Sequence, residues 1–481
     1  MQRKFFSNLI LLLLLNLLVK PAWVLGIDRS FQNHLGFANY GDYANIFSFS
    51  LILSVILDLG INNFVSSAIA KQPERINELY LPLLFVKIFF GLIYIIITLV
   101  AGWLYGYNAY FLALLLWLCI NQLIAYIATF NRSFVSGLQL YQTDAWLSVI
   151  DRFTMLLLGV FMVWIPLLPV NLKTFIGIQT AGYLMVLLAS LLVLMGHLRY
   201  RGSAHIRQQV YPVFRQALPY ALLALLMMCY AKVDSLVLKK LHLNGSLENG
   251  IYAAGGRLFD AANMFAVLIG FMLLPAFSAN LSKPDELKKL VRSAVIILPS
   301  FGLFVSVFCY VYRLEIMQAM YHEANAYTAS VFGTQMFSYT MMCGMYVFGT
   351  LLTAGKELNL LNGLAFVALI LNVAGNILLV PELGALACAR VGLATHTFIF
   401  ITNLVFALKK SPGLFPVSYL AKYVLLSLGS VCIITLFGYL QFSFVLAGIV
   451  GCAIWIILVF VLQLVNVQSI RGIFMSTQAI N

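Results

Sequence analysis

Charged residues lie within stretches of this chain that are otherwise apolar enough to cross a bilayer. An ionised side chain at the centre of a membrane costs at least ~2.5 kcal/mol, so such residues face a protein interior or an aqueous cavity and pair there. We expect the cations to line a cavity that binds an anionic cargo, and the carboxylates to support coupling to H+ or Na+. The cations are Lys20, Lys87, Arg152, Lys232, Arg257 and Arg390, and the carboxylates are Asp58, Asp151, Asp234 and Asp260.

Several of these charges also fit a purely structural role. Arg257 and Asp260 are spaced i,i+3, so they can meet on one helix face, and Asp151 is adjacent to Arg152. Ion pairs of this kind would lock helices together and bind no cargo.

Two lysines are harder to explain as structural. Lys20 and Lys232 have no opposite charge three or four positions away in either direction. Arg390 and Asp234, by contrast, lie near span ends, where a charged side chain can snorkel to the membrane surface. We therefore expect Lys20 and Lys232 to bind phosphate.

The composition is that of an integral membrane protein. Hydrophobic residues make up 62% of the 481 residues and charged residues 9%, against roughly 45 to 50% and about 25% in soluble domains. In a membrane protein a net charge of +13 is explained by topology and by contact with anionic lipid, and it does not indicate a nucleic-acid partner. The seven cysteines show no metal-ligand spacing, and we expect no cofactor.

Hydropathy predicts an all-α polytopic fold of about fourteen spans. The expected cytoplasmic ends and loops hold eighteen of the 29 lysines and arginines and the outer side five, which predicts that both termini are cytoplasmic. The first span also resembles a signal peptide, but we keep it as a helix because the internal repeat needs it. The predicted spans are 6–28, 43–65, 79–103, 110–130, 145–168, 174–195, 216–238, 250–272, 291–312, 331–354, 359–380, 386–408, 419–439 and 444–465.

Two weak internal echoes predict pseudo-symmetric lobes. Residues 40–44 match 249–253 at Gly, Tyr and Ala, 209 positions later, and residues 136–139 resemble 354–357. An even number of helices per repeat preserves orientation, so the lobes are related by an axis along the membrane normal. The first helices of the two lobes then carry Lys20 and Lys232 to opposite walls of one cavity. The expected parts are a six-helix lobe with a cytoplasmic linker at 1–215, a second six-helix lobe at 216–411, and two further helices with a short tail at 412–481.

Enzyme motifs are missing from the sequence. There is no Gly-x-Ser-x-Gly elbow, phosphate loop or His-Glu-x-x-His, and no outer loop large enough for a catalytic domain. We therefore expect a protein that is not an enzyme, with a membrane glycan polymerase as an alternative. Tyr40, Tyr43, Tyr252, Phe259 and Phe265 fit either stacking on sugar rings or an interfacial aromatic belt.

Five stretches resemble bacterial polysaccharide flippases of the O-antigen and capsule type, which belong to the multidrug/oligosaccharidyl-lipid/polysaccharide (MOP) superfamily. The most specific are DLGI at 58–61 and NGIY at 249–252; fourteen spans are typical of the lipid II flippase branch, whereas many O-antigen flippases have twelve. The stretches are 35–43, 57–61, 233–252, 371–376 and 381–385.

The resemblance implies two six-helix lobes that work by alternating access in the bacterial cytoplasmic (inner) membrane. The implied cargo is an undecaprenyl-pyrophosphate-linked oligosaccharide, moved from the inner to the outer leaflet for surface polysaccharide biosynthesis. Membrane lipids, a polysaccharide polymerase and chain-length machinery are the implied partners. An ion-coupled exporter of drugs or metabolites from the same superfamily is the alternative.

Overall fold

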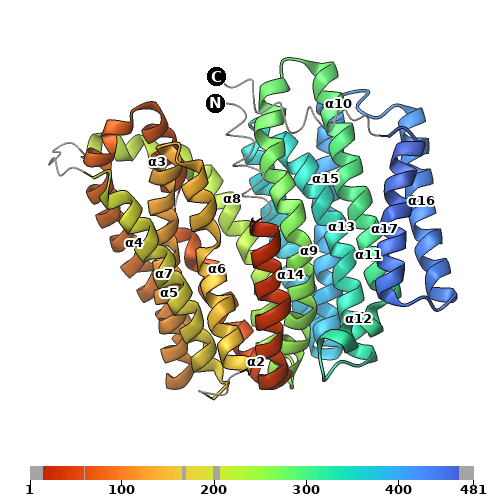
Figure 1. Ribbon diagram of the computed structural model, residues 1–481, viewed down its shortest axis with the longest axis horizontal. Helices are drawn as coiled ribbons and strands as arrows, with labels where there is room; N and C mark the ends of the chain where they lie inside the picture. The colour runs from red at the N-terminus through yellow and green to blue at the C-terminus, as the bar shows by residue number, and fades with distance from the viewer. Residues whose placement is uncertain (1–14, 59, 165–168, 199–205, 465–481) are drawn as a thin grey trace. The chain divides into compact units, whose positions relative to one another are not determined.

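The computed structural model of the chain describes residues 15–58, 60–164, 169–198 and 206–464, and their regular structure is helical throughout. By packing, the chain divides into two compact units, unit 1 (Met1–Lys240) and unit 2 (Leu241–Asn481) (Figure 1). Unit 1 contains α2 (Arg29–Ile52), α3 (Ile61–Lys71), α4 (Ile76–Tyr105), α5 (Ala109–Gly137), α6 (Tyr141–Trp164), α7 (Leu172–Met195) and nearly all of α8 (Ile206–Leu241). Unit 2 contains α9 (Gly245–Asn280), α10 (Pro284–Val295), α11 (Phe301–Val311), α12 (Arg313–Met320), α13 (Ala326–Ala354), α14 (Leu358–Leu383), α15 (Ala385–Lys410), α16 (Val417–Tyr439) and α17 (Phe444–Val461).

Twelve helices of the described chain are long and apolar enough to cross a membrane. The first, Leu15–Leu57, is bent at Gly36, whose φ of 74° and ψ of 162° are not helical. The bend divides this helix into two arms of about 21 residues, each roughly 31 Å long at 1.5 Å per residue, close to the ~30 Å hydrocarbon core. With the second arm and α13 counted separately, the described residues contain fourteen helical segments long enough to span a membrane, the number that the sequence predicts.

Two predicted boundaries near the N-terminus are wrong. The loop expected between the first two spans is helical apart from the bend at Gly36, and the second span ends at Leu57, not at residue 65. Gly60 adopts the left-handed conformation with φ 80° and α3 then begins separately at Ile61, which is a helix-stop geometry that glycine allows without steric strain. Residues 6–14 of the predicted first span lie outside the described residues.

The connection predicted at 197–215 is helical from Ile206 onward, because α8 begins there. The sequence boundary between the two units falls after Lys240, whereas the sequence repeat places the lobe boundary at 215. Packing and internal repetition are different criteria, so the boundaries 1–215, 216–411 and 412–481 stay a prediction.

The core of unit 1 joins α3, α4, α5 and α7. Phe130 and Phe134 of α5 are fully buried and pack with Tyr80 of α4 at centroid distances of 5.9 and 5.4 Å. Small residues let helices approach: a Cβ on Gly182 of α7 would lie 2.7 Å from the carbonyl oxygen of Asp151 on α6. This close packing of α6 and α7 fixes the backbone that carries Asp151.

The core of unit 2 surrounds α13, which packs against α9, α11 and α15. This helix buries polar and small residues, among them Thr328, Gln335 and Ser338. A helix enclosed by protein needs no lipid-facing surface, which explains why α13 is too polar to count among the twelve most apolar helices.

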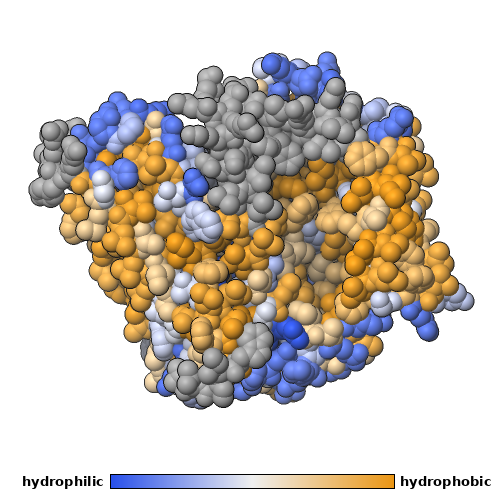
Figure 2. All heavy atoms as spheres, in the orientation of Figure 1, coloured by the Kyte–Doolittle hydropathy of each residue, from blue (hydrophilic) through white to orange (hydrophobic). Residues whose placement is uncertain are grey.

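The last two helices attach to unit 2 through α11. Phe304 and Val307 of α11 pack with Ile434 of α16 and Ala447 of α17. Their remaining surfaces are apolar and open, with large side chains such as Leu428 and Ile449 more than half exposed, and Figure 2 shows the apolar colour continuing over this face. Exposed apolar faces on long helices are the surfaces that a bilayer covers.

Candidate functional site

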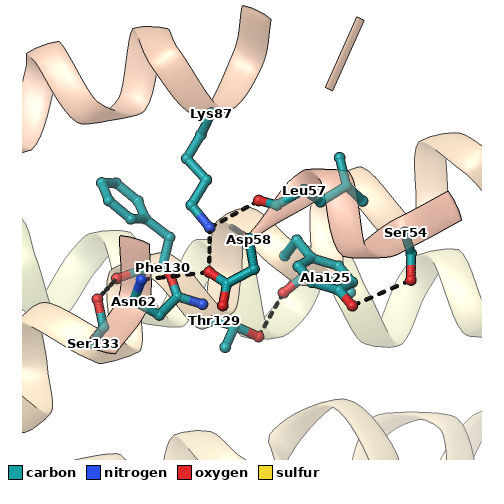
Figure 3. A network of polar contacts seen from close by, with 10 residues as sticks. Ser54, Leu57, Asp58, Asn62, Lys87, Ala125, Thr129, Phe130 and Ser133 are labelled. Atoms are coloured by element: carbon teal, nitrogen blue, oxygen red, sulfur yellow. Dashed lines mark hydrogen bonds and ion pairs between the residues drawn. The ribbon is translucent and has the colours of Figure 1, made fainter. Parts of the chain in front are cut away.

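A buried ion pair joins two predicted site residues at one end of unit 1. The Lys87 ammonium on α4 donates to Asp58 Oδ1 at 2.8 Å and to the carbonyl oxygen of Leu57 at 2.9 Å (Figure 3). The Phe130 ring centroid lies 5.7 Å away. Lys87 is 2% exposed and Asp58 is 31% exposed. The ammonium thus neutralises both a carboxylate and the negative end of the helix that terminates at Leu57.

The Lys87–Asp58 pair closes the break between two helices. Asp58 Oδ1 also accepts a long hydrogen bond of 3.4 Å from the backbone N–H of Asn62, in the first turn of α3. Because the ammonium is enclosed and donates to both a carboxylate and a carbonyl oxygen, this geometry favours a structural role for Lys87. A cargo-binding role for Lys87 stays a prediction.

The helix that carries Lys20 is aligned with α6 by contacts on either side of Lys20. Asn16 Nδ2 donates to Ser148 Oγ on α6 at 2.9 Å, across a separation of 132 positions. Ile27 and Gly159 are also 132 positions apart, and Ile27 occupies the space that a Cβ on Gly159 would need. A constant offset means that the two helices run parallel, so Lys20 lies beside residues 151 and 152.

Five charges gather at this level of unit 1. Arg132 Nε donates to Asp144 Oδ1 at 2.7 Å, and Arg152 Nε lies 3.5 Å from Asp151 Oδ2. Lys20 is close enough to Asp151, Arg152 and Arg132 to interact with their charges. Three cations face two carboxylates, which leaves one positive charge. We call these five residues the Lys20 cluster.

The Lys20 cluster is incompletely paired. Among the described residues, the Lys20 ammonium makes neither a hydrogen bond nor an ion pair, and the buried Asp151 Oδ1 accepts no hydrogen bond. The Arg152 guanidinium lies 5.8 Å from the centre of the Tyr183 ring. An ammonium that makes no direct ion pair inside a membrane protein attracts an anion or water, so the cluster suits one phosphate-sized anion.

Lys232 and Asp234, both on α8, differ in their surroundings. Lys232 is half-buried and forms no ion pair among the described residues, whereas Asp234 is 3% exposed. The predicted placement of Lys20 and Lys232 on opposite walls of one cavity stays a prediction.

The predicted charges of unit 2 form one pair and one exposed cation. Arg257 Nη1 lies 3.8 Å from Asp260 Oδ2 on α9, so these two side chains do meet on one helix face. Arg390 on α15 is exposed and forms no ion pair within the described part of the chain. Their binding of cargo stays a prediction.

Two buried carboxylates were not recognised from the sequence. Asp28 is 3% exposed and accepts a 2.5 Å hydrogen bond from the Tyr40 hydroxyl. Glu248 is 9% exposed; its Oε2 accepts from the Tyr327 hydroxyl and from the backbone N–H of Ala385, each at 2.6 Å. Asp28 meets Tyr40 only because the chain bends at Gly36, and Glu248 was assigned to a loop before the span that begins at 250. The only sequence signal for either was an acidic residue beside a predicted span.

Glu248 supports the start of α15. A carboxylate beside the first N–H groups of a helix satisfies donors that have no partner within the helix. Gly384 precedes this helix with φ 54°, and a Cβ there would lie 2.3 Å from Glu248 Oε2. Glycine is therefore required beside Glu248, which gives a physical reason for part of the 381–385 motif.

Two of the three tyrosines expected to face sugar or the membrane surface are buried instead. Tyr40 and Tyr43 are 0% and 2% exposed, and both pack against Phe175. Gln179 Nε2 donates to the Tyr43 hydroxyl at 2.7 Å. In this structure these two rings form core, so they are neither an aromatic belt nor an open stacking platform.

The chain shares its fold with solved structures of membrane transporters. A lipid II flippase, MurJ, in an inward closed conformation matches with a TM-score of 0.67 and 14% identity, covering 93% of this chain and 98% of that one. An inward-facing multidrug resistance MATE transporter of the MOP superfamily matches with a TM-score of 0.69 and 13% identity, covering 82% and 95%. A MOP superfamily transporter from Pyrococcus furiosus, described by the reverse polarity of its binding pocket, matches with a TM-score of 0.57 and 13% identity, covering 85% and 96%.

Sequence comparison identifies the family. No curated protein matches the chain significantly. The profile of the family described as "Polysaccharide biosynthesis protein" matches residues 6–281, more than half of the chain. The chain is a multi-pass membrane protein that belongs to this polysaccharide biosynthesis protein family and has the fold of MOP superfamily transporters.

Proposed function

We propose that this protein is a flippase that moves undecaprenyl-pyrophosphate-linked oligosaccharides from the inner to the outer leaflet of the bacterial cytoplasmic membrane by alternating access. The observation that carries the proposal is the Lys20 cluster, which lies within a membrane helix bundle and has one positive charge in excess and an ammonium that makes no direct ion pair among the described residues. A pyrophosphate is a multivalent anion that answers such a charge. Family membership and the shared fold with MurJ support a lipid-linked cargo.

The experiment measures flipping of a fluorescent undecaprenyl-pyrophosphate-linked oligosaccharide in proteoliposomes. Lys20→Ala and Lys232→Ala should each reduce the rate about tenfold or more, as expected for losing a charge-assisted contact. Because lysine acts as a point charge, Lys20→Arg and Lys232→Arg should restore part of the rate. Lys71→Ala, at an exposed lysine ending α3, is the matched control and should flip normally. Unaltered flipping by both alanine variants at normal protein level would contradict the proposal.

Coupling to H+ or Na+ through Asp58, Asp151, Asp234 or Asp260 is part of the proposal. Asp151 is the best placed of these, because one of its buried oxygens accepts no hydrogen bond among the described residues. Asp151→Asn should weaken the dependence of flipping on the ion gradient. The same dependence in all four Asp→Asn variants would exclude these carboxylates.

An ion-coupled exporter of drugs or metabolites is the second candidate, favoured by the fold shared with MATE transporters. The two candidates differ in what accumulates when the protein is absent. A flippase deletion should retain lipid-linked sugar in the inner leaflet, whereas an exporter deletion should raise the cell content of a soluble compound. Accumulation of unpolymerised units in the outer leaflet would instead indicate a membrane glycan polymerase.

A further inference from the structure

One end of α8 is fastened to α2 and to the turn between α4 and α5. The Lys239 ammonium lies 2.5 Å from Asp42 Oδ1. Asn45 Nδ2 donates to the carbonyl oxygen of Ser235 at 2.9 Å, and the Tyr105 hydroxyl donates to that of Leu236 at 2.7 Å. These side-chain contacts therefore join α8 to α2 and α4 over about one helical turn.

A second layer orients the amide of Asn45. The Tyr107 hydroxyl donates to Asn45 Oδ1 at 2.5 Å, which leaves Asn45 Nδ2 pointed at α8. Burial raises the pKa of the Tyr107 hydroxyl, so it remains a neutral donor. The rings of Tyr105 and Tyr107 pack 4.9 Å apart and both contact Phe49. Asn45 is 1% exposed, so water does not replace these bonds in this state.

These contacts are of a kind that can separate without unfolding a helix. Ser235 and Leu236 lie within α8, where each carbonyl also belongs to the hydrogen-bond ladder of the helix itself. The bonds from Asn45 and Tyr105 are additional bonds from side chains, and the Lys239–Asp42 pair is partly exposed at 28% and 20%. Breaking them leaves α8, α2 and α4 intact. A second hydrogen bond to a carbonyl that already accepts one is weak, and a partly hydrated ion pair is weak too. Both interactions can exchange with water.

We propose that Asp42, Asn45, Tyr105 and Tyr107, together with the segment 235–239 of α8, form a latch that holds this end of the helices closed in one half of the transport cycle and opens in the other. The proposal rests on the proposed function, because only a transporter needs α8 to leave α2. The expected topology places this end on the outer side of the membrane.

The first test measures opening without any cargo. A Ser235→Cys substitution places a thiol at a side chain that is 6% exposed within the latch, and its labelling by a membrane-impermeant maleimide is compared with the parent protein. Adding Asp42→Asn or Asn45→Ala should raise the labelling rate about tenfold, as expected for losing one well-formed hydrogen bond to a charged or buried partner. The charge exchange Asp42→Lys with Lys239→Asp should restore slow labelling, which a misfolded protein would not do. Glu286→Gln, in the exposed 3.3 Å pair with Lys289, is the matched control and should change nothing.

The second test links the latch covalently. Cysteines at 42 and 239, bridged by a bifunctional methanethiosulfonate reagent, should stop flipping, and dithiothreitol should restore it by cleaving the bridge. Equal labelling rates in all variants, or full flipping by the bridged protein, would show a fixed joint and overturn the latch. Faster labelling in the latch variants of a protein that flips no lipid-linked sugar would support the latch and contradict the proposed cargo instead.

Discussion

Two lysines in the membrane helices of unit 1 have the same chemistry and opposite surroundings. Lys87 is 2% exposed, and its ammonium contacts a carboxylate and a helix-terminal carbonyl within 3 Å. Lys20 has no hydrogen-bond or ion-pair partner among the described residues, although two cations and one carboxylate are close enough to act on it. We therefore predict that Lys87 stabilises the fold and that Lys20 binds an anion.

Replacing each lysine by methionine should affect the protein in different ways. Lys87→Met leaves Asp58 and the Leu57 carbonyl without their cation, and breaking a buried pair costs roughly 3 to 5 kcal/mol, somewhat less here because Asp58 is partly hydrated. We expect a large drop in the thermal unfolding midpoint in detergent and in the amount of folded protein. Adding Asp58→Asn should recover part of that stability, because the uncompensated carboxylate is then removed. A Lys87→Met protein as stable as the unaltered one would show that the pair contributes nothing.

Lys20→Met should have the reverse profile. Removing an ammonium that makes no direct ion pair leaves Asp151 still paired with Arg152, so the unfolding free energy should change by no more than about 0.5 kcal/mol. Flipping should fall about tenfold or more, since the phosphate contact is lost. The unfolding midpoint and the flipping rate, measured on one preparation, decide the comparison. Loss of folded protein on the scale of Lys87→Met would assign Lys20 a structural role too.

Hydropathy alone predicted most of the helices but not where charges meet. The span at 331–354 was predicted although α13 is more polar than the twelve helices apolar enough to cross a membrane, because its length and small residues still fit a helix. The bend at Gly36 was not predicted, because residues 29–42 were expected to form a loop between two spans and a glycine gives no sign of its φ angle. That bend brings Asp28 to Tyr40, and the helix break at Gly60 brings Asp58 to Lys87, 29 positions away in sequence.

The individual residues of the candidate site were predicted from the sequence. Which of these charged residues lie together in the fold was predicted only in part. The pairs Arg257 with Asp260 and Asp151 with Arg152 follow from local spacing, which the sequence states directly. The position of Lys20 beside Asp151 depends on the packing of two parallel helices 132 positions apart. Tertiary register of this kind has no local signature in one sequence, because many offsets bury the same apolar surface.

Loosening the alignment between the helix that carries Lys20 and α6 should have the smallest effect. Asn16→Leu removes the 2.9 Å hydrogen bond to Ser148 and keeps a side chain of similar size, so the unfolding free energy should fall by roughly 0.6 to 1 kcal/mol, as for interhelical hydrogen bonds in membranes. Lys20 lies one turn further along the same helix, so a loosened register should displace its ammonium from the cluster and slow flipping about two- to fivefold, an effect of under ~1 kcal/mol. Ser148→Ala should act similarly.

The double variant Asn16→Leu with Ser148→Ala distinguishes register from simple loss of stability. If the two side chains act through their mutual bond, the second substitution adds little to the first, and the coupling energy equals most of either single effect. The flipping rate and the unfolding midpoint are measured for all four proteins of the cycle. The control is Trp117→Phe, which removes another side-chain hydrogen bond to a hydroxyl, the 2.9 Å bond to Thr180 between α5 and α7. It should lower stability by a similar amount without slowing flipping. Equal slowing by Trp117→Phe would mean that flipping responds to stability in general, and the special position of Lys20 would then rest on the Lys20→Met result alone.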